Sequence, residues 1–198
     1  MSDKRAVTAH PIHPLLAERW SPLAFAPRKV EPEKLHSLFE AARWAASCFG
    51  EQPWRFIVAT QDDAADFEKL AGCLMPGNSW AMKAPVLALS VASLNFSQNG
   101  KPNRHAFHDV GLAVGNLTTE AQSLGIYLHQ MGGFDAAKAT EILGIPEGYA
   151  PVAMIALGYL GDPTTLTEDQ QKRVAAPRKR KAQSEFVFGA KWGESAKL

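Results

Sequence analysis

Cysteine is scarce in this chain. Only Cys48 and Cys73 occur among its 198 residues, and they do not form a Cys-x-x-Cys pair. This usage indicates neither a disulfide framework nor a thiolate metal site. The reducing cytoplasm is therefore the location that we expect for the protein.

Long apolar runs and a dominant charge are also missing. The longest apolar runs, residues 84–94 and 151–161, reach about half of the ~20 residues that cross a bilayer, so they are typical of buried strands. The first residues lead into polar, proline-containing sequence without the apolar core of a secretory signal. The formal net charge of +1 provides no global attraction to nucleic acid or to an anionic membrane. We therefore expect neither as a partner.

Several catalytic signatures are absent as well. The sequence contains no P-loop, no Gly-x-Ser-x-Gly elbow and no Gly-x-Gly-x-x-Gly fingerprint, so a nicotinamide cofactor would bind transiently and not in a Rossmann domain. His105 and His108 lie one helical turn apart, but no third ligand has a suitable spacing. We expect no metal centre.

The composition that remains is that of a folded domain. Hydrophobic residues make up 46% and charged residues 21% of the chain, and a chain of this length buries roughly 70% of its unfolded surface. The length fits one domain, or one protomer of an interlocked dimer. Hydrophobic periodicity predicts helices at residues 14–19, 33–46, 64–74, 105–124 and 136–143, and strands at 55–59, 86–93, 126–129 and 152–159. This order indicates an α+β or α/β layer structure whose sheet is covered on both sides.

The predicted helix at residues 105–124 keeps its apolar spacing throughout, which places it at the centre of the fold. Gly111 and Gly115 lie four residues apart on one of its faces, a spacing that lets another backbone approach closely. That backbone could belong to a second subunit, or the glycines could make room for a bulky neighbour. The sequence leaves both interpretations open.

The most informative stretch is residues 45–56, where a helical pattern passes into a strand pattern through small residues and a Gln-Pro-Trp. Ala46, Ser47 and Gly50 leave backbone N–H and C=O groups unshielded, which suits hydrogen bonding to the polar edge of a ring system. The alternative is an ordinary helix-to-strand loop.

The part of the chain beyond Asp162 is polar and basic. Six basic residues and no acidic ones lie between Lys172 and Lys181, which is typical of a solvated surface or of a segment that contacts nucleic acid. The segment could be disordered, but apolar anchors favour an extended arm that wraps a partner subunit. These anchors are Phe186, Val187, Phe188 and Trp192.

Several segments resemble, in order along the chain, the motifs of the nitroreductase family of flavin enzymes. Residues 45–54 are similar to the family's Ala-Pro-Ser-x-x-Asn-x-Gln-Pro-Trp motif beside the flavin ring, and residues 19–25 to its amino-terminal Arg-x-Ser-x-Arg-x-Phe element. Residues 78–85 resemble the segment that presents an Asn to the flavin, residues 131–134 the glycine turn near its reactive nitrogen, and residues 178–181 the basic element that holds the phosphate. The similar segments cover nearly the whole chain, from about residue 19 to residue 193.

The resemblance implies a single domain over residues 1–198 with an α+β, three-layer fold, in which helices flank a central, mostly antiparallel sheet. It also implies an intertwined homodimer whose C-terminal arm, approximately residues 163–198, is swapped onto the partner subunit. The implied cofactor is FMN, with NAD(P)H as a transient co-substrate. The implied cofactor-binding residues are Arg19, Trp20, Ser21, Leu23, Ser47, Cys48, Gly50, Gln52, Asn78, Met131, Gly132, Gly133, Arg178 and Arg180.

The resemblance also implies what these residues do. The arginines and the hydroxyl of Ser21 suit the phosphate, because guanidinium forks bind its oxygens in pairs. Asn78 can donate to an oxygen of the ring or ribityl chain, although it also fits an ordinary turn after Pro76-Gly77. Gly132 and Gly133 precede a helix expected to open near residue 135, whose amino terminus would gather N–H groups near the nitrogen that carries the hydride. No acid–base side chain is evident.

The sequence departs from the family pattern at three positions. Leu23 replaces the second cation of the amino-terminal element, which leaves Arg28 or Lys29 as substitutes. Ala46 stands where Pro is usual, and Gly50 stands where Asn is usual. The loss of that Asn side chain would affect substrate orientation more than cofactor binding.

The function predicted from the sequence is that of a homodimeric, flavin-dependent oxidoreductase. NAD(P)H and an oxidised small molecule, such as a nitroaromatic, a quinone or an enone-like compound, would bind in turn to one open face of the flavin. The alternatives are a flavin-binding or basic-tail interaction protein without turnover, and a family member specialised for flavin fragmentation or dehalogenation.

Overall fold

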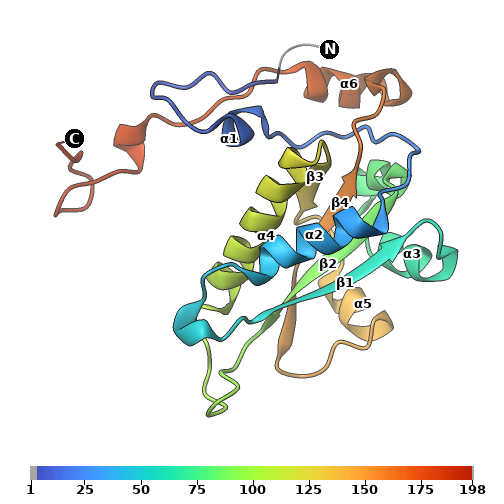
Figure 1. Cartoon of the computed structure of the whole chain (residues 1–198), viewed down its shortest axis with the longest axis horizontal. Coiled ribbons are helices and arrows are strands. Elements are labelled where there is room, and N and C mark those ends of the chain that lie inside the picture. The colour runs from blue at the N-terminus through green and yellow to red at the C-terminus, as the bar shows by residue number, and fades with distance from the viewer. Residues whose placement is uncertain (1–3, 198) are drawn as a thin grey trace.

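The computed structural model describes residues 4–197 and has a four-stranded sheet at its centre (Figure 1). The strands are β1 (Trp54–Thr60), β2 (Val86–Ser93), β3 (Tyr127–Met131) and β4 (Tyr149–Gly158), in the order β1-β2-β4-β3. All neighbouring strands pair antiparallel. The α+β class is therefore confirmed, and the α/β alternative, which needs parallel strands, is wrong.

The two central strands, β2 and β4, are apolar because both of their faces are covered. Successive side chains of a strand point to opposite faces. Leu87 and Leu89 accordingly enter one hydrophobic core, whereas Val86 and Ala88 enter the other. All four are at most 1% exposed, which explains why neither strand carries a charged residue.

Helices form a layer on each side of the sheet. On one side α2 (Pro32–Arg43) and the long α4 (Ala106–Ser123) pack together (Figure 1). On the other side lie α3 (Ala64–Ala71), the 3-10 helix η2 (Pro76–Lys83) and α5 (Ala136–Ile142). The helices predicted at residues 64–74, 105–124 and 136–143 are thereby confirmed, with shorter ends.

The helix predicted at residues 33–46 stops early, at Arg43. Trp44 is the C-cap, and Ser47 is already extended, with φ of −148° and ψ of 157°. The chain turns here toward the loop of residues 47–52. Alanine favours helix, so Ala45 and Ala46 gave no sign of this end in the sequence.

The N-terminal segment crosses the end of the sheet and includes the short helix α1 (Pro14–Glu18). It is fixed to the chain after β4 by two backbone hydrogen bonds: Ala26 N–H donates to the Tyr159 carbonyl (2.9 Å), and Gly161 N–H donates to the Ala24 carbonyl (3.0 Å). A Cβ on Gly161 would lie 2.4 Å from the carbonyl carbon of Phe25, so this approach requires glycine. The pairing sets the position of residues 19–23.

After β4 the chain continues through the 3-10 helix η3 (Pro163–Thr165), α6 (Glu168–Ala175) and an extended segment that contains η4 (Gln183–Glu185). The sequence pattern did not predict α6, although a capping box of Thr167 and Gln170 marks its start. The extended segment runs beside the N-terminal segment and away from the sheet (Figure 1).

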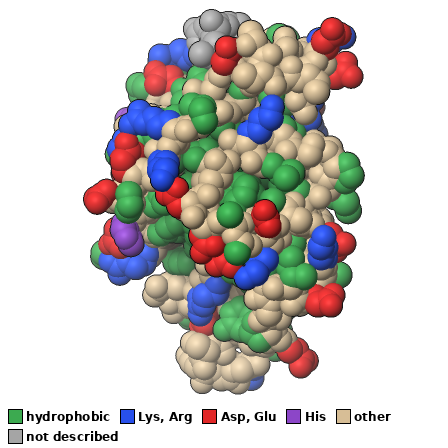
Figure 2. Space-filling model, turned by 90° about the vertical axis from the view of Figure 1, so that its right-hand side faces the viewer, with side chains coloured by type: hydrophobic (Ala, Val, Ile, Leu, Met, Phe, Trp, Pro, Cys, Tyr) green, Lys and Arg blue, Asp and Glu red, His purple; other side chains and the backbone are tan. Residues whose placement is uncertain are grey.

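The surface carries mixed charges. On the face drawn in Figure 2, acidic and basic side chains are intermingled, and hydrophobic side chains reach the surface between them. That face has no broad basic area of the kind that binds nucleic-acid backbones. Among the helices of residues 4–197, none combines the length and the apolar character that a membrane crossing requires.

Candidate functional site

Arginine side chains from both ends of the chain converge on one hollow, which we call the arginine pocket. It has a volume of about 280 Å³ and lies between the N-terminal segment, β3, α6 and the segment after α6. Its charged lining residues are Lys4, Arg19, Arg173, Arg178 and Arg180, and Ser21 adds a hydroxyl. No acidic side chain is among the described residues that line it. Such a pocket attracts an anion, and its guanidinium groups suit the oxygens of a phosphate.

The cations of the arginine pocket are crowded. The pKa of Arg19 lies below its ordinary value, first because the guanidinium is partly buried and then because Arg178 and Arg180 lie nearby. Burial, followed by the charge of Arg180, lowers the pKa of Arg178 in the same way. An anion in the pocket would relieve both effects, because it would solvate the buried guanidinium groups and offset their repulsion.

Hydrogen bonds hold three of these arginines. Nη1 of Arg180 donates to the carbonyl of its neighbour Lys179 (2.8 Å). Nη1 of Arg178 donates to the carbonyls of Lys4 (2.7 Å) and Ala17 (3.0 Å). Nη1 of Arg19 lies 3.4 Å from Oγ of Ser21. Arg178 therefore ties the two ends of the chain together, in addition to facing the pocket.

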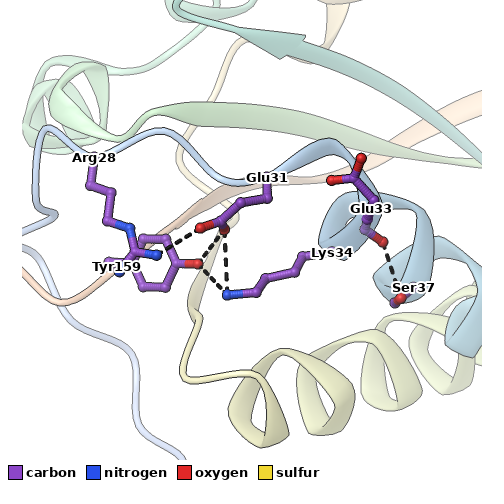
Figure 3. Close-up of polar contacts among 6 residues, drawn as sticks. All are labelled: Arg28, Glu31, Glu33, Lys34, Ser37 and Tyr159. Carbon is purple, nitrogen blue, oxygen red and sulfur yellow. Dashed lines mark hydrogen bonds and ion pairs between the residues drawn. The ribbon is translucent and has the colours of Figure 1, made fainter.

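Arg28 does not replace the cation lost at position 23, so that expectation is wrong. Its Nη2 pairs with Oε1 of Glu31 (2.6 Å), and its guanidinium lies 3.8 Å from the ring centroid of Tyr159. Nζ of Lys34 donates to the Tyr159 hydroxyl (2.7 Å), which in turn donates to Oε2 of Glu31. Figure 3 shows the side chains of Arg28, Glu31 and Lys34 gathered around the Tyr159 phenol, and we call these four residues the Tyr159 cluster. The cluster joins the start of α2 to the end of β4.

The expectation that Lys29 replaces the missing cation is also wrong, because Nζ of Lys29 pairs with Oδ1 of Asp62 (2.5 Å). The pocket has two cations that were not predicted, Lys4 of the N-terminal segment and Arg173 in the last turn of α6. The sequence showed Arg173 only as part of a basic run, since its orientation depends on a helix that was not predicted. The capping box of Thr167 and Gln170 was the available signal.

Two predicted residues form an apolar wall of the arginine pocket. Leu23 is only 3% exposed, and Trp20 packs edge-on against Tyr127 with ring centroids 6.1 Å apart. Trp20 also lines a second, larger cavity of about 610 Å³, together with Leu160 and Val174. Trp20 therefore separates a cationic hollow from a mostly apolar one.

The loop of residues 47–52 has a strained backbone. Phe49 (φ 54°) and Gln52 (φ 51°) occupy the left-handed region, which costs a residue with a side chain on the order of 1 kcal/mol. Gly50, between them, has φ of 68°. Oγ of Ser47 accepts a hydrogen bond from Gln52 N–H (3.0 Å) and closes the loop. Backbone strain that a local hydrogen bond holds in place is typical of functional loops.

Asp109 of α4 supports this loop, a role that the sequence analysis missed. Its carboxylate is buried, accepts a hydrogen bond from Cys48 N–H (2.9 Å) and contacts Nδ1 of His108 (2.9 Å). Buried carboxylates occur where they are paired. The only sequence signal was an acid inside an apolar helical pattern.

The turn at Gly132 and Gly133 presents free backbone donors. Within residues 4–197 the N–H groups of both glycines have no hydrogen-bond acceptor. The carbonyl of Gly133 accepts from Met75 N–H (3.1 Å) and from Nδ2 of Asn78 (2.9 Å). Asn78 therefore holds the turn in place. Met131, the last residue of β3, has its side chain buried in the core.

These glycine donors do not belong to a helix terminus, contrary to expectation. Helix α5 begins at Ala136, and the carboxylate of its N-cap, Asp135, accepts from Lys138 N–H (2.9 Å). Asp135 N–H donates to the Cys73 carbonyl (2.8 Å). The free N–H groups precede this cap and are a property of the turn.

His129 and Trp80 connect the arginine pocket with the glycine turn. His129, on β3, lines the pocket, and its ring centroid lies 4.6 Å from that of Trp80. Trp80 and Asn78 belong to the same 3-10 helix, η2. These contacts link the cations of the arginine pocket to the glycine turn. Residues 47–52, in contrast, line neither of the two cavities within this chain.

Sequence comparisons place this arrangement among known proteins. The sequence model of the nitroreductase family matches residues 16–159. An uncharacterized 15.4 kDa protein of Mycolicibacterium smegmatis is 40% identical over 146 residues, which cover 70% of this chain and 97% of that protein. The FMN reductase (NAD(P)H) of Bacillus subtilis is 25% identical over 165 residues, which cover 74% of this chain and 65% of that protein.

Solved structures share the fold over nearly the full length. A structure described as an oxidoreductase containing FMN has a TM-score of 0.90 and 33% sequence identity, and the match covers 98% of this chain and 99% of that one. A nitroreductase family protein of Clostridium difficile 630 has a TM-score of 0.70 at 22% identity, over 89% of this chain and 96% of that one. The second likeness concerns the fold alone.

Proposed function

The chain belongs to the nitroreductase family, whose members are oxidoreductases, and from this we propose that it is an FMN-dependent enzyme. It uses NAD(P)H to reduce nitroaromatic, quinone or related small electron acceptors in a ping-pong reaction. The observation that carries the proposal is the arginine pocket, with its four arginines and no carboxylate among the described lining residues. The FMN-containing structure and the FMN reductase among its relatives support the choice of cofactor.

The residues present fit FMN at two points. The arginine pocket offers guanidinium groups to the phosphate. The N–H groups of Gly132 and Gly133, which have no acceptor within residues 4–197, suit the polar edge of the ring. Polar groups left without partners are costly unless water or a ligand satisfies them. A ligand with a phosphate at one end and ring acceptors at the other satisfies both sets.

When bound, FMN supplies the hydride chemistry. The chain binds and orients: the arginines hold the phosphate, and Asn78 fixes the turn that presents Gly132 and Gly133. Their N–H dipoles favour negative charge at the ring edge. No side chain of the site is assigned as a general acid or base. One open ring face admits one partner at a time, which is the reason for the ping-pong order.

The proposal includes a homodimer that completes the site. The strained loop of residues 47–52 lines neither cavity of its own chain, and we assign it to the ring-binding site of the partner subunit. A Cβ on Gly111 or Gly115 would have no atom of the described chain within 4 Å, which favours a subunit contact over a bulky neighbour at this face of α4. Beside them on α4, Leu112 is 40% exposed.

The C-terminal arm, approximately residues 163–198, begins on its own chain, where Leu166 is buried in the core and Arg178 binds the carbonyls of Lys4 and Ala17. We propose that its outer part, beyond Arg180, contacts the partner subunit. Within it Phe186 is 60% and Trp192 is 89% exposed. Large apolar side chains with this exposure favour burial against another surface. The arm also delivers Arg173, Arg178 and Arg180 to the arginine pocket.

The visible spectrum of the purified protein tests the function. We expect a yellow protein whose flavin absorbance bleaches when NADPH or NADH is added without oxygen. After the nicotinamide is removed, a quinone or nitroaromatic should restore the oxidised spectrum, which is the second half of a ping-pong reaction. A colourless protein that takes up no FMN would overturn the cofactor, and a yellow protein that neither nicotinamide bleaches would overturn the electron donor.

A further inference from the structure

His129 lies in the middle of β3 and lines the arginine pocket. Its imidazole is held between the indole of Trp80, with ring centroids 4.6 Å apart, and the carbonyl oxygen of Pro22, 2.7 Å from Nδ1. A carbonyl oxygen only accepts, so Nδ1 carries a hydrogen and donates it. The ring is therefore fixed in place, and Nε2 is the atom that remains for other chemistry.

Nε2 of His129 is accessible. It has no hydrogen-bond partner within residues 4–197, yet it is not sealed from solvent in the way that Nε1 of Trp80 is. Its access is through the arginine pocket, which the residue lines. In a neutral ring with hydrogen on Nδ1, Nε2 carries a lone pair and cannot donate to an anion.

All the charged groups that line the pocket around His129 are positive in the part of the chain that the structure describes. The N-terminal segment contributes Lys4 and Arg19, α6 contributes Arg173, and the segment after it contributes Arg178 and Arg180. Neither β3 nor η2 adds a charged side chain to the lining.

These surroundings favour the neutral imidazole. Burial holds the pKa of His129 below its ordinary value, and the charges of Arg173 and Arg19 add to that effect, whereas the hydrogen bond to Pro22 opposes it. A phosphate in the pocket lowers the net positive charge around the ring and places negative oxygens among the cations, which favours the protonated imidazole.

We propose that His129 is a phosphate ligand that changes its protonation state when the pocket is occupied. As a phosphate group enters, Nε2 takes up one proton from solvent and donates it as N–H to a phosphate oxygen, while Nδ1 keeps its hydrogen bond to Pro22. This inference rests on the proposed function only in that the phosphate belongs to FMN. Inorganic phosphate would act in the same way.

The coupling gives phosphate affinity a definite pH dependence. Because occupancy raises the pKa of His129, affinity is highest below the value of the free protein and falls as pH rises toward the value of the complex. The fall is at most about tenfold per pH unit within that window. The second ionisation of the phosphate, near pH ~6, acts in the opposite sense. The contribution of His129 is therefore measured as the difference in phosphate affinity between wild type and His129→Gln at each pH.

The first experiment uses the flavin-free, full-length protein and inorganic phosphate. The histidine ring signals are titrated by NMR with and without phosphate, and the His129 signal is identified by its loss in His129→Gln. We expect phosphate to raise the pKa of His129, and the exposed His36 on α2 serves as the internal control. An unchanged His129 overturns the proposal, whether or not the protein binds flavin.

The second experiment compares FMN with riboflavin, which lacks the phosphate, in fluorescence titrations of wild type, His129→Gln and the matched control His36→Gln. We expect His129→Gln to weaken FMN binding roughly tenfold near pH ~6 and progressively less at higher pH, with riboflavin unaffected. An equal loss at every pH would show contact without proton uptake and would overturn the proposal. If FMN does not bind wild type but phosphate still raises the pKa of His129, the proposed function fails and this inference stands.

Discussion

At the scale of single residues, the arginines of the pocket differ in the hydrogen bonds that they make within the chain. Nη1 of Arg178 is committed to two backbone carbonyls, whereas Arg173 makes no hydrogen bond within residues 4–197. We expect Arg173→Ala to weaken FMN binding about tenfold to 100-fold. The variant loses one charge-assisted hydrogen bond to the phosphate, which contributes about 1.5–3 kcal/mol. Fluorescence titration measures the FMN affinity, and riboflavin affinity should stay unchanged.

The matched control is Arg28→Ala, because Arg28 is engaged in the Tyr159 cluster and does not line the pocket. If Arg28→Ala weakened FMN binding as much as Arg173→Ala does, the arginine pocket would not be the phosphate site.

We expect the two glycines of the turn to differ in how strongly an alanine substitution lowers the stability of the protein. A Cβ on Gly133 would lie 2.7 Å from Nδ2 of Asn78, so Gly133→Ala must displace the amide that holds the turn. A Cβ on Gly132 would meet no atom within 4 Å. We expect Gly133→Ala to lower the free energy of unfolding by about 1 kcal/mol or more and Gly132→Ala to change it by less than about 0.5 kcal/mol, measured by urea denaturation. Equal losses would contradict this.

Sequence motifs identified the site residues that belong to a local pattern, even where they lie far apart along the chain, and missed those that belong to none. Arg19, Arg178 and Arg180 were predicted as phosphate ligands from local resemblance, and the structure brings them to one pocket. Arg173 and His129 have no motif of their own, because their place depends on α6 and on the register of β3. Packing between segments that are far apart in the sequence leaves no periodic pattern in the sequence.

At the scale of elements, the predicted helices and strands are those with a buried side. β2 and α4 were recognised because burial imposes an apolar pattern on them. Helix α6 buries none of its residues, so no apolar stripe marks it, and only its capping box does. The early end of α2 was missed because helix-favouring alanines continue past it.

The Tyr159 cluster, which joins α2 to β4, predicts a pH effect on stability. The pKa of Glu31 is lowered to about 2, first because of its hydrogen bond from the Tyr159 hydroxyl and also by Arg28 and Lys34. Because the pKa of Glu31 is lower in the folded than in the unfolded protein, its carboxylate stabilises the fold above the unfolded-state pKa of ~4.3. This stabilisation is lost as the pH falls toward the folded-state pKa of about 2. We expect Glu31→Gln to lower the melting temperature at neutral pH and to flatten its decline in that window.

The control for this effect is Glu33→Gln, in the first turn of α2, because the Glu33 carboxylate points away from the cluster in Figure 3. Glu33→Gln should leave both the melting temperature and its acid dependence close to those of wild type. A parallel decline for wild type and Glu31→Gln would contradict the assignment.

At the scale of the whole molecule, the chain should be a dimer, and the dimer should be required for the cofactor. We expect Leu112→Glu to place a charge in the subunit contact of α4, shift the mass seen by light scattering to that of a monomer and weaken FMN binding at least tenfold. Ile142→Glu is the matched control, because Ile142 on α5 is equally exposed, at 39% against 40% for Leu112. A monomeric wild type that binds FMN fully would contradict the dimer.

The convergence of the chain ends on the arginine pocket has a practical consequence. Lys4 and Arg180, which are far apart along the chain, face the same hollow, so we expect a small multivalent anion to fasten the segments around them without any covalent link. A sulfate-containing buffer would shield these segments from proteases, whereas a chloride buffer would leave them to be trimmed. Proteolytic maps recorded in one buffer therefore do not transfer to the other.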